Sequence, residues 1–199
     1  MIRPSHRLLL FLLIVVASAR PAVAEPPDAT NAPVASSTDY EVIELVLLDL
    51  IDYKEFRPES DLDGKKTKIV LSDLTRGGPA GLLAQEASKP EWNISEEALV
   101  DLLHRNPKRP VSLAEFVPTN ERILVKNLNN INLRHDFRKT YPDARGYVKT
   151  WLPGYSKDGL EAAVVVSFGP RAHAATAVYW LVRDDGQWKV KRRKTKYYV

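Results

Sequence analysis

The sequence predicts an α+β fold in which helices pack on one face of a C-terminal four-stranded antiparallel meander. An apolar, helix-like stretch comes early, at residues 38–56. Four strand-like runs follow at the end of the chain, at 146–152, 159–168, 174–183 and 187–198. Because only short turns separate these runs, we expect neighbouring strands to pair antiparallel and in chain order.

The first 24 residues have the three regions of a cleavable secretory signal peptide. Arg3 and Arg7 make the start basic, residues 8–19 are apolar except for Ser18, and residues 22–24 are small. The apolar run is shorter than the roughly 20 residues that cross a bilayer. We therefore expect an exported protein, periplasmic or secreted, with no membrane span after cleavage.

The rest of the chain predicts a leader followed by one domain. Residues 25–37 are rich in Pro, Ala and Ser, a composition typical of a disordered segment. Residues 38–199 are enough for a single α+β domain with a core of its own. The chain has no Cys, which excludes disulfides, thiolate nucleophiles and thiolate metal sites.

The stretch at residues 38–56 is the clearest helix signal. Thr38 and Glu41 have the spacing of a capping box. On a helical wheel Glu41, Glu44, Asp49 and Asp52 share one stripe, and apolar residues fill the remainder. This pattern predicts a mostly buried helix with one acidic edge in water.

Shorter elements are expected between this helix and the C-terminal runs. The pattern predicts strands at 68–71 and 123–126, and helices at 96–105 and 132–141. Ser95 provides an N-cap for the second helix. Asp185-Gly186 predicts a two-residue hairpin between the last two strands.

Charge is divided unevenly along the chain. All 199 residues carry 29 Lys+Arg and 25 Asp+Glu; without the signal, which holds three Arg and no acid, the balance is 26 minus 25, or +1. This small net charge disfavours nucleic acid as a partner. Residues 25–103 have 7 basic and 17 acidic side chains, and residues 104–199 have 19 and 8. Either the two halves attract each other on folding, or the basic half meets an anionic partner.

The basic residues of the last strand are the candidate binding residues: Lys189, Lys191, Arg193, Lys194 and Tyr197. Aromatic rings among cations are typical of surfaces that bind polyanions. The candidate partners are an anionic envelope polymer or another protein. The alternative, which we favour, is that the lysines protect a sheet edge from aggregation, because strand alternation divides the charges between two faces.

Catalytic motifs are weak in this sequence. His104, His135 and His173 lack the spacing of a metal site, and we expect neither metal nor cofactor. The sequence therefore predicts a non-enzymatic binding or interaction module. The alternative is a hydrolase that uses His173 with Asp158 or Glu161.

The C-terminal region has recognisable motifs: PGYSKDG at 153–159, GPRAH at 169–173 and VYWLVRDDGQWKV at 178–190. With them, residues 141–199 resemble the C-terminal part of an uncharacterised family of exported bacterial proteins. The resemblance covers about the last third of the chain. It implies a signal-bearing bacterial protein and implies no activity.

Overall fold

The computed structural model describes residues 33–53, 67–77, 92–106, 108–169 and 175–197. The predicted signal peptide and most of the predicted leader lie outside these residues, and so does His173. The described residues form an α+β fold, in which a mixed sheet is flanked by helices.

Helix α1 (Ser37–Asp52) begins earlier and ends earlier than predicted. Its N-cap is Ser36, whose hydroxyl accepts a hydrogen bond from the Asp39 N–H at 3.2 Å. In return the Asp39 carboxylate accepts one from the Ser36 N–H at 2.7 Å. The capping box predicted at Thr38 and Glu41 is therefore wrong, because the equivalent pair two residues earlier satisfies the first backbone donors.

The sheet is larger than predicted and not purely antiparallel. Among the described residues its strands are β1 (Lys68–Ser72), β2 (Ile123–Lys126), β3 (Ala144–Thr150), β4 (Gly154–Tyr155), β5 (Glu161–Gly169), β6 (Ala175–Asp184) and β7 (Gln187–Tyr197). Their order is β2-β1-β3-β5-β6-β7, with β4 paired to β5. The four predicted C-terminal strands correspond to β3, β5, β6 and β7, which pair antiparallel in chain order. The prediction of a sheet formed by these four strands alone is wrong, because they belong to a larger mixed sheet in which β1 pairs parallel with both β2 and β3. Connections as long as those around β1 allow the crossovers that parallel pairing needs.

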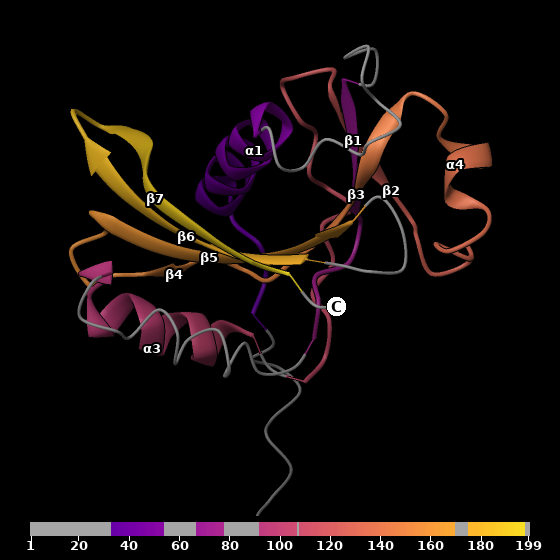
Figure 1. Ribbon diagram of the computed structural model, residues 1–199. Helices are drawn as coiled ribbons and strands as arrows, with labels where there is room; N and C mark the ends of the chain where they lie inside the picture. The colour runs from indigo at the N-terminus through magenta and orange to yellow at the C-terminus, as the bar shows by residue number, and fades with distance from the viewer. Residues whose placement is uncertain (1–32, 54–66, 78–91, 107, 170–174, 198–199) are drawn as a thin grey trace, which may run out of the picture. The chain divides into compact units, whose positions relative to one another are not determined.

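Helices cover both faces of the sheet, so the prediction of one covered face is also wrong. Helix α1 packs against Val164 and Val166 of β5, whereas α3 (Glu96–Arg105) packs against Ala163 and Val165 (Figure 1). Successive side chains of a strand point to opposite faces. Both sets in β5 are apolar, so the strand is buried on both sides and its sequence does not alternate as a half-exposed strand does.

Several local elements lie where the sequence predicts them. Helix α3 has the predicted bounds, and the Ser95 hydroxyl caps it by accepting from the Ala98 N–H at 3.3 Å. Asp185 and Gly186 both have positive φ, 51° and 76°, as a two-residue hairpin requires. The predicted helix at 132–141 is reduced to α4 (Phe137–Thr140).

Only part of the acidic edge of α1 is in water: Glu41 and Asp52 are exposed as predicted, whereas Glu44 and Asp49 contact protein. Glu44 is only 9% exposed. One of its carboxylate oxygens accepts hydrogen bonds from the Thr119 hydroxyl and the Asn120 N–H, both at 2.8 Å. This helix edge thereby anchors the loop that leads into β2.

Ion pairs from α1 reach three arginines of the basic half of the chain. The pairs are Asp39 with Arg105, Asp49 with Arg193, and Asp52 with Arg122. These contacts favour the first explanation of the uneven charge, attraction between the two halves on folding. Basic residues outside these three pairs with α1 are the ones considered for binding below.

Candidate anion-binding interface

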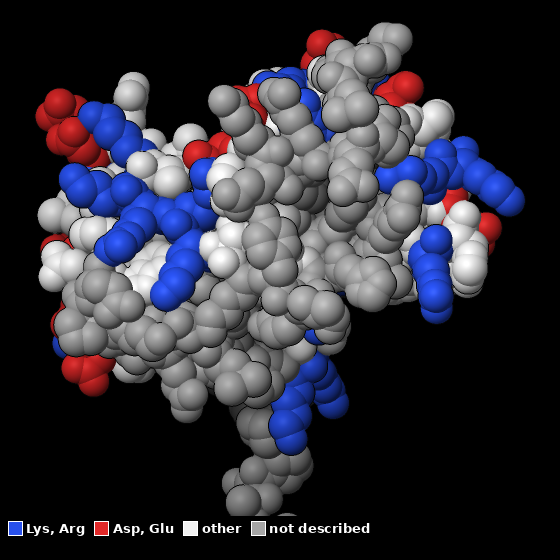
Figure 2. Space-filling view, viewed as in Figure 1, with Lys and Arg blue, Asp and Glu red and all other residues white. Residues whose placement is uncertain are grey.

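Strand β7, which carries the predicted binding residues, is the last strand of the sheet. Lys and Arg side chains gather on the side of the molecule where β7 lies (Figure 2). Arg192 is the register partner of Trp180 and Val190 that of Leu181, so Lys191 is an extra, bulged residue. Bulges and lysines are both features that protect sheet edges from pairing with other chains.

Arg193 faces α1 and stabilises the fold. Its guanidinium pairs with Asp49 and lies over the ring of Tyr53, 3.6 Å from the centroid. Burial, reinforced by the nearby Asp49, raises the pKa of the adjacent Tyr179 and keeps its phenol neutral. Arg193 therefore joins β7 to α1 and is not available to a ligand.

We expect Arg193→Gln to lower the free energy of unfolding by about 1–2 kcal/mol, since it removes a partly buried, charge-assisted pair and a cation–π contact. Urea unfolding followed by circular dichroism measures this change. Lys191→Gln is the matched control on the same strand, because Lys191 is exposed. Equal stabilities for the two variants would contradict the structural role of Arg193.

The opposite face of β7 presents cations to solvent. The Arg192 Cζ and the Lys194 Nζ lie 5.6 and 5.9 Å from the centroid of Trp92, which is 1% exposed. Arg192 itself is exposed. It is not among the predicted binding residues, although its place two residues before Lys194 puts both on one face of the strand.

The remaining predicted residues differ in their surroundings. Lys189 is exposed and pairs with Asp184 at 2.6 Å, a contact of little energetic weight at a surface. Lys191 is exposed at the bulge. The backbone of Tyr197 pairs with Ala175 at the end of β7. We call Lys189, Lys191, Arg192 and Lys194 the β7 basic surface.

The contacts of the described residues do not support the hydrolase alternative. His173 lies outside them. Asp158 accepts hydrogen bonds within its own turn, and Glu161 accepts one from the Ser95 N–H at 3.0 Å. Glu161 begins β5, whereas His173 belongs to the segment that follows the other end of this strand. The pairing of His173 with either carboxylate stays a prediction.

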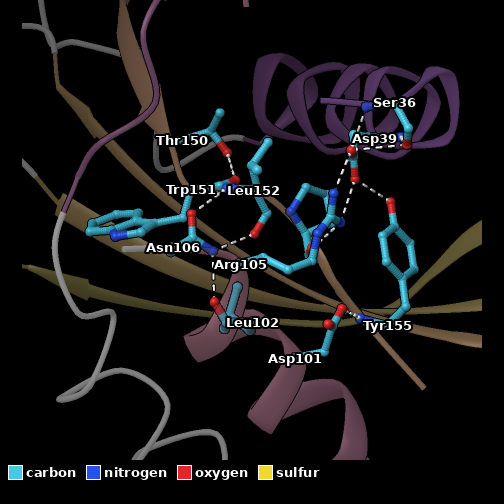
Figure 3. A network of polar contacts seen from close by, with 11 residues as sticks. Ser36, Asp39, Asp101, Leu102, Arg105, Asn106, Thr150, Trp151, Leu152 and Tyr155 are labelled. Carbon is cyan, nitrogen blue, oxygen red and sulfur yellow. Dashed lines mark hydrogen bonds and ion pairs between the residues drawn. The ribbon is translucent and has the colours of Figure 1, made fainter. Parts of the chain in front are cut away.

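A buried polar network joins α1, α3 and β4 (Figure 3). Two nitrogens of Arg105 donate to the two carboxylate oxygens of Asp39, each at 2.8 Å, and the Tyr155 hydroxyl donates to Asp39 at 2.9 Å. Arg105 also donates to the Pro153 carbonyl at 2.7 Å. Asp39 has no exposed surface. Because its charge is fully compensated, this network serves the fold.

A cleft of about 590 Å³ lies beside this network, between the outer side of α3 and residues 155–157. Its charged lining is mainly acidic, with Glu96, Glu97 and Asp101. Glu97 pairs with Lys157 at 3.1 Å, and Asp101 accepts a hydrogen bond from the Tyr155 N–H at 2.9 Å. The excess of carboxylates disfavours an anionic ligand in this cleft.

Comparison with known proteins finds no matching family model, no matching curated protein and no matching solved structure. Within the described segments, no helix is long and apolar enough to cross a membrane. A functional conclusion therefore depends on the contacts and charges of the chain itself.

Proposed function

We propose that the protein is an exported, non-enzymatic binding module that contacts an anionic polymer of the cell envelope through the β7 basic surface. One observation carries the proposal: Arg192 and Lys194 lie together over the Trp92 ring, beside the exposed Lys191. Three cations thus stand close together at one sheet edge. Export follows from the predicted signal peptide and is part of the proposal.

The aromatic contact supports this function in a physical way. A cation held over an indole ring keeps its charge while losing part of its rotational freedom. Binding an anion then costs less ordering entropy than it would with a solvated side chain. The side chains of Arg192 and Lys194 are thereby already ordered before the partner binds.

The charge balance also supports it. Arg193 forms an ion pair with Asp49, and Lys189 forms one with Asp184. Lys191, Arg192 and Lys194 lie together on the last strand of the sheet, where a run of negative charges can bind. Such binding releases counterions, so its affinity falls linearly with salt on logarithmic axes.

The triple variant Lys191→Gln, Arg192→Gln, Lys194→Gln tests this function. We expect it to leave a dextran sulfate column at lower salt than the original protein, with affinity reduced about tenfold or more. The logarithmic salt dependence should also become shallower by about 2–3, close to one per lost contact.

The control removes three exposed lysines elsewhere, Lys108, Lys126 and Lys139, also to Gln. Both variants have the same net charge, so only the location of the lost charges differs. Equal loss of retention in both would contradict a specific β7 surface. Unchanged retention with increased aggregation of the β7 variant would identify edge protection as the role of these residues.

A further inference from the structure

A second concave site lies on the face of the sheet opposite α1, over β3 and the neighbouring ends of β1 and β5. Its volume is about 410 Å³. It separates two apolar clusters on this face, one formed around α3 with Trp151 and one around Phe137 of α4. The floor between them is polar.

Strand register places the floor residues side by side. Lys149 of β3 and Ser167 of β5 are direct register partners, and Tyr147 lies two residues before Lys149 on the same face. Ser72, at the end of β1, adds a second hydroxyl. Ser72 and Ser167 are only 2% and 4% exposed, so their hydroxyls line the bottom of the pocket.

The loop after β1 forms one wall, and close packing holds it in place. The Thr75 N–H donates to the Val111 carbonyl at 2.9 Å, and the Val111 N–H donates to the Thr75 hydroxyl at 2.7 Å. A Cβ on Gly77 would lie 2.4 Å from the Lys108 carbonyl oxygen, so only glycine allows this approach. The wall is therefore preformed.

Arg76 extends from this wall. Its backbone N–H donates to the Thr150 carbonyl at 2.7 Å, and its guanidinium lies 5.3 Å from the centroid of the Trp151 ring. Burial raises the pKa of Tyr147, and the Arg76 charge acts against this rise, which places the guanidinium within electrostatic reach of the phenol. Arg76 thus lines the pocket with its guanidinium beside the Trp151 ring.

The charges of this pocket are uncompensated. Within the part of the chain that the structure describes, neither Arg76 nor Lys149 has a carboxylate partner, and no carboxylate lines the pocket. By contrast, Arg105, Arg122 and Arg193 each pair with a carboxylate of α1. Two cations above buried hydroxyls, without an acid, make an environment that favours an oxyanion.

We propose that this pocket binds a small polar ligand with one oxyanion group, a carboxylate or a phosphate. Arg76 and Lys149 bind the anionic group, and the hydroxyls of Ser167 and Ser72 bind the polar remainder. The volume of about 410 Å³ lies within the range of small-molecule sites and suits a ligand of monosaccharide size. Uronic acids and sugar phosphates have this chemistry.

The site is independent of the β7 basic surface. No residue of that surface lines it, and it recognises one small anion rather than a polymer. Either proposal can therefore fail while the other holds. Retention on dextran sulfate reports on β7, and titration with small anions reports on this pocket.

The test is titration of the purified protein with glucuronate, glucose 6-phosphate, inorganic phosphate and glucose, followed by calorimetry. We expect the sugar anions to bind and neutral glucose to bind at least tenfold more weakly. Arg76→Gln and Lys149→Met should each weaken the sugar anions about tenfold or more. Ser167→Ala should weaken glucose 6-phosphate while leaving inorganic phosphate nearly unchanged.

The control is Lys139→Met, which removes an exposed lysine from α4. It should bind every probe as the original protein does. The proposal is wrong if neither sugar anion binds at 10 mM (about 3 kcal/mol of affinity), if glucose binds equally well, or if both Arg76→Gln and Lys149→Met retain full affinity. Thermal melts check that both variants are folded. Because Lys149 lies in the floor of the pocket and Arg76 on its wall, a folding defect in one variant leaves the other as a valid test.

Discussion

Gly154→Ala is expected to lower the free energy of unfolding by about 3 kcal/mol or more. A Cβ at this position would lie 2.1 Å from the Leu102 nitrogen and 2.3 Å from the Ala98 carbonyl oxygen. Both are backbone atoms of α3, so the helix would have to move away from β4. That movement would open the apolar cluster that α3 forms with Trp151 and Val165.

Gly159→Ala is the matched control, and urea unfolding measures both variants. Gly159 has a φ of 69° but no atom within 4 Å of an added Cβ. Its substitution should therefore cost only about 1–2 kcal/mol, through backbone strain. If Gly154→Ala is no more destabilising than Gly159→Ala, the close contact between α3 and β4 is wrong.

Asp39→Ala is expected to destabilise the protein by about 3–5 kcal/mol, because it leaves the guanidinium of Arg105 largely buried without a counterion. The side chain of Arg105 is 17% exposed and that of Asp39 not at all. Denaturant unfolding gives the change. The double variant Asp39→Ala, Arg105→Met should recover part of the loss, since it removes the unpaired charge.

The same pair predicts how stability depends on pH. Burial alone would raise the pKa of Asp39, but hydrogen bonds from Arg105 and Ser36, together with the Arg105 charge, lower it overall. The ionised pair therefore stabilises the fold above the unfolded pKa of about 4, and this contribution is lost as pH falls through the lower folded pKa. Asp39→Ala should lack this part of the acid sensitivity. An unchanged pH profile in the variant would contradict the assignment.

Local signals in the sequence determined much of the secondary structure. Helix α3, strands β1 and β2 and the turn at Asp185 and Gly186 lie where capping, periodicity and turn chemistry predict them. These signals act over a few residues. Short runs such as 68–71 therefore indicate a strand without indicating its neighbour.

The short turns of the C-terminal region also indicated the antiparallel pairing of β5, β6 and β7. The parallel pairings and the arrangement of layers were decided by the tertiary structure. The parallel pairing of β1 with β3 depends on contacts across a long stretch of chain, which no local pattern records. The sequence of β5 is apolar on both faces, so only the packing of α1 and α3 reveals a sheet covered on two sides. The acidic stripe of α1 has the same cause: its sequence indicates polarity, and the fold places Asp49 against Arg193.

The candidate sites show the same division. The sequence by itself determined that cations concentrate in the last strand, because charge is a property of each residue. Tertiary structure decided that Arg193 pairs with α1 whereas Arg192 and Lys194 lie over Trp92. It also decided the pocket, where pairing of β3 with β1 and β5 brings Arg76, Lys149 and Ser167 together from distant parts of the chain. Bringing these residues together depends on the strand register, and their charge environment depends on which carboxylates pair with which cations. Both are determined only when the chain packs.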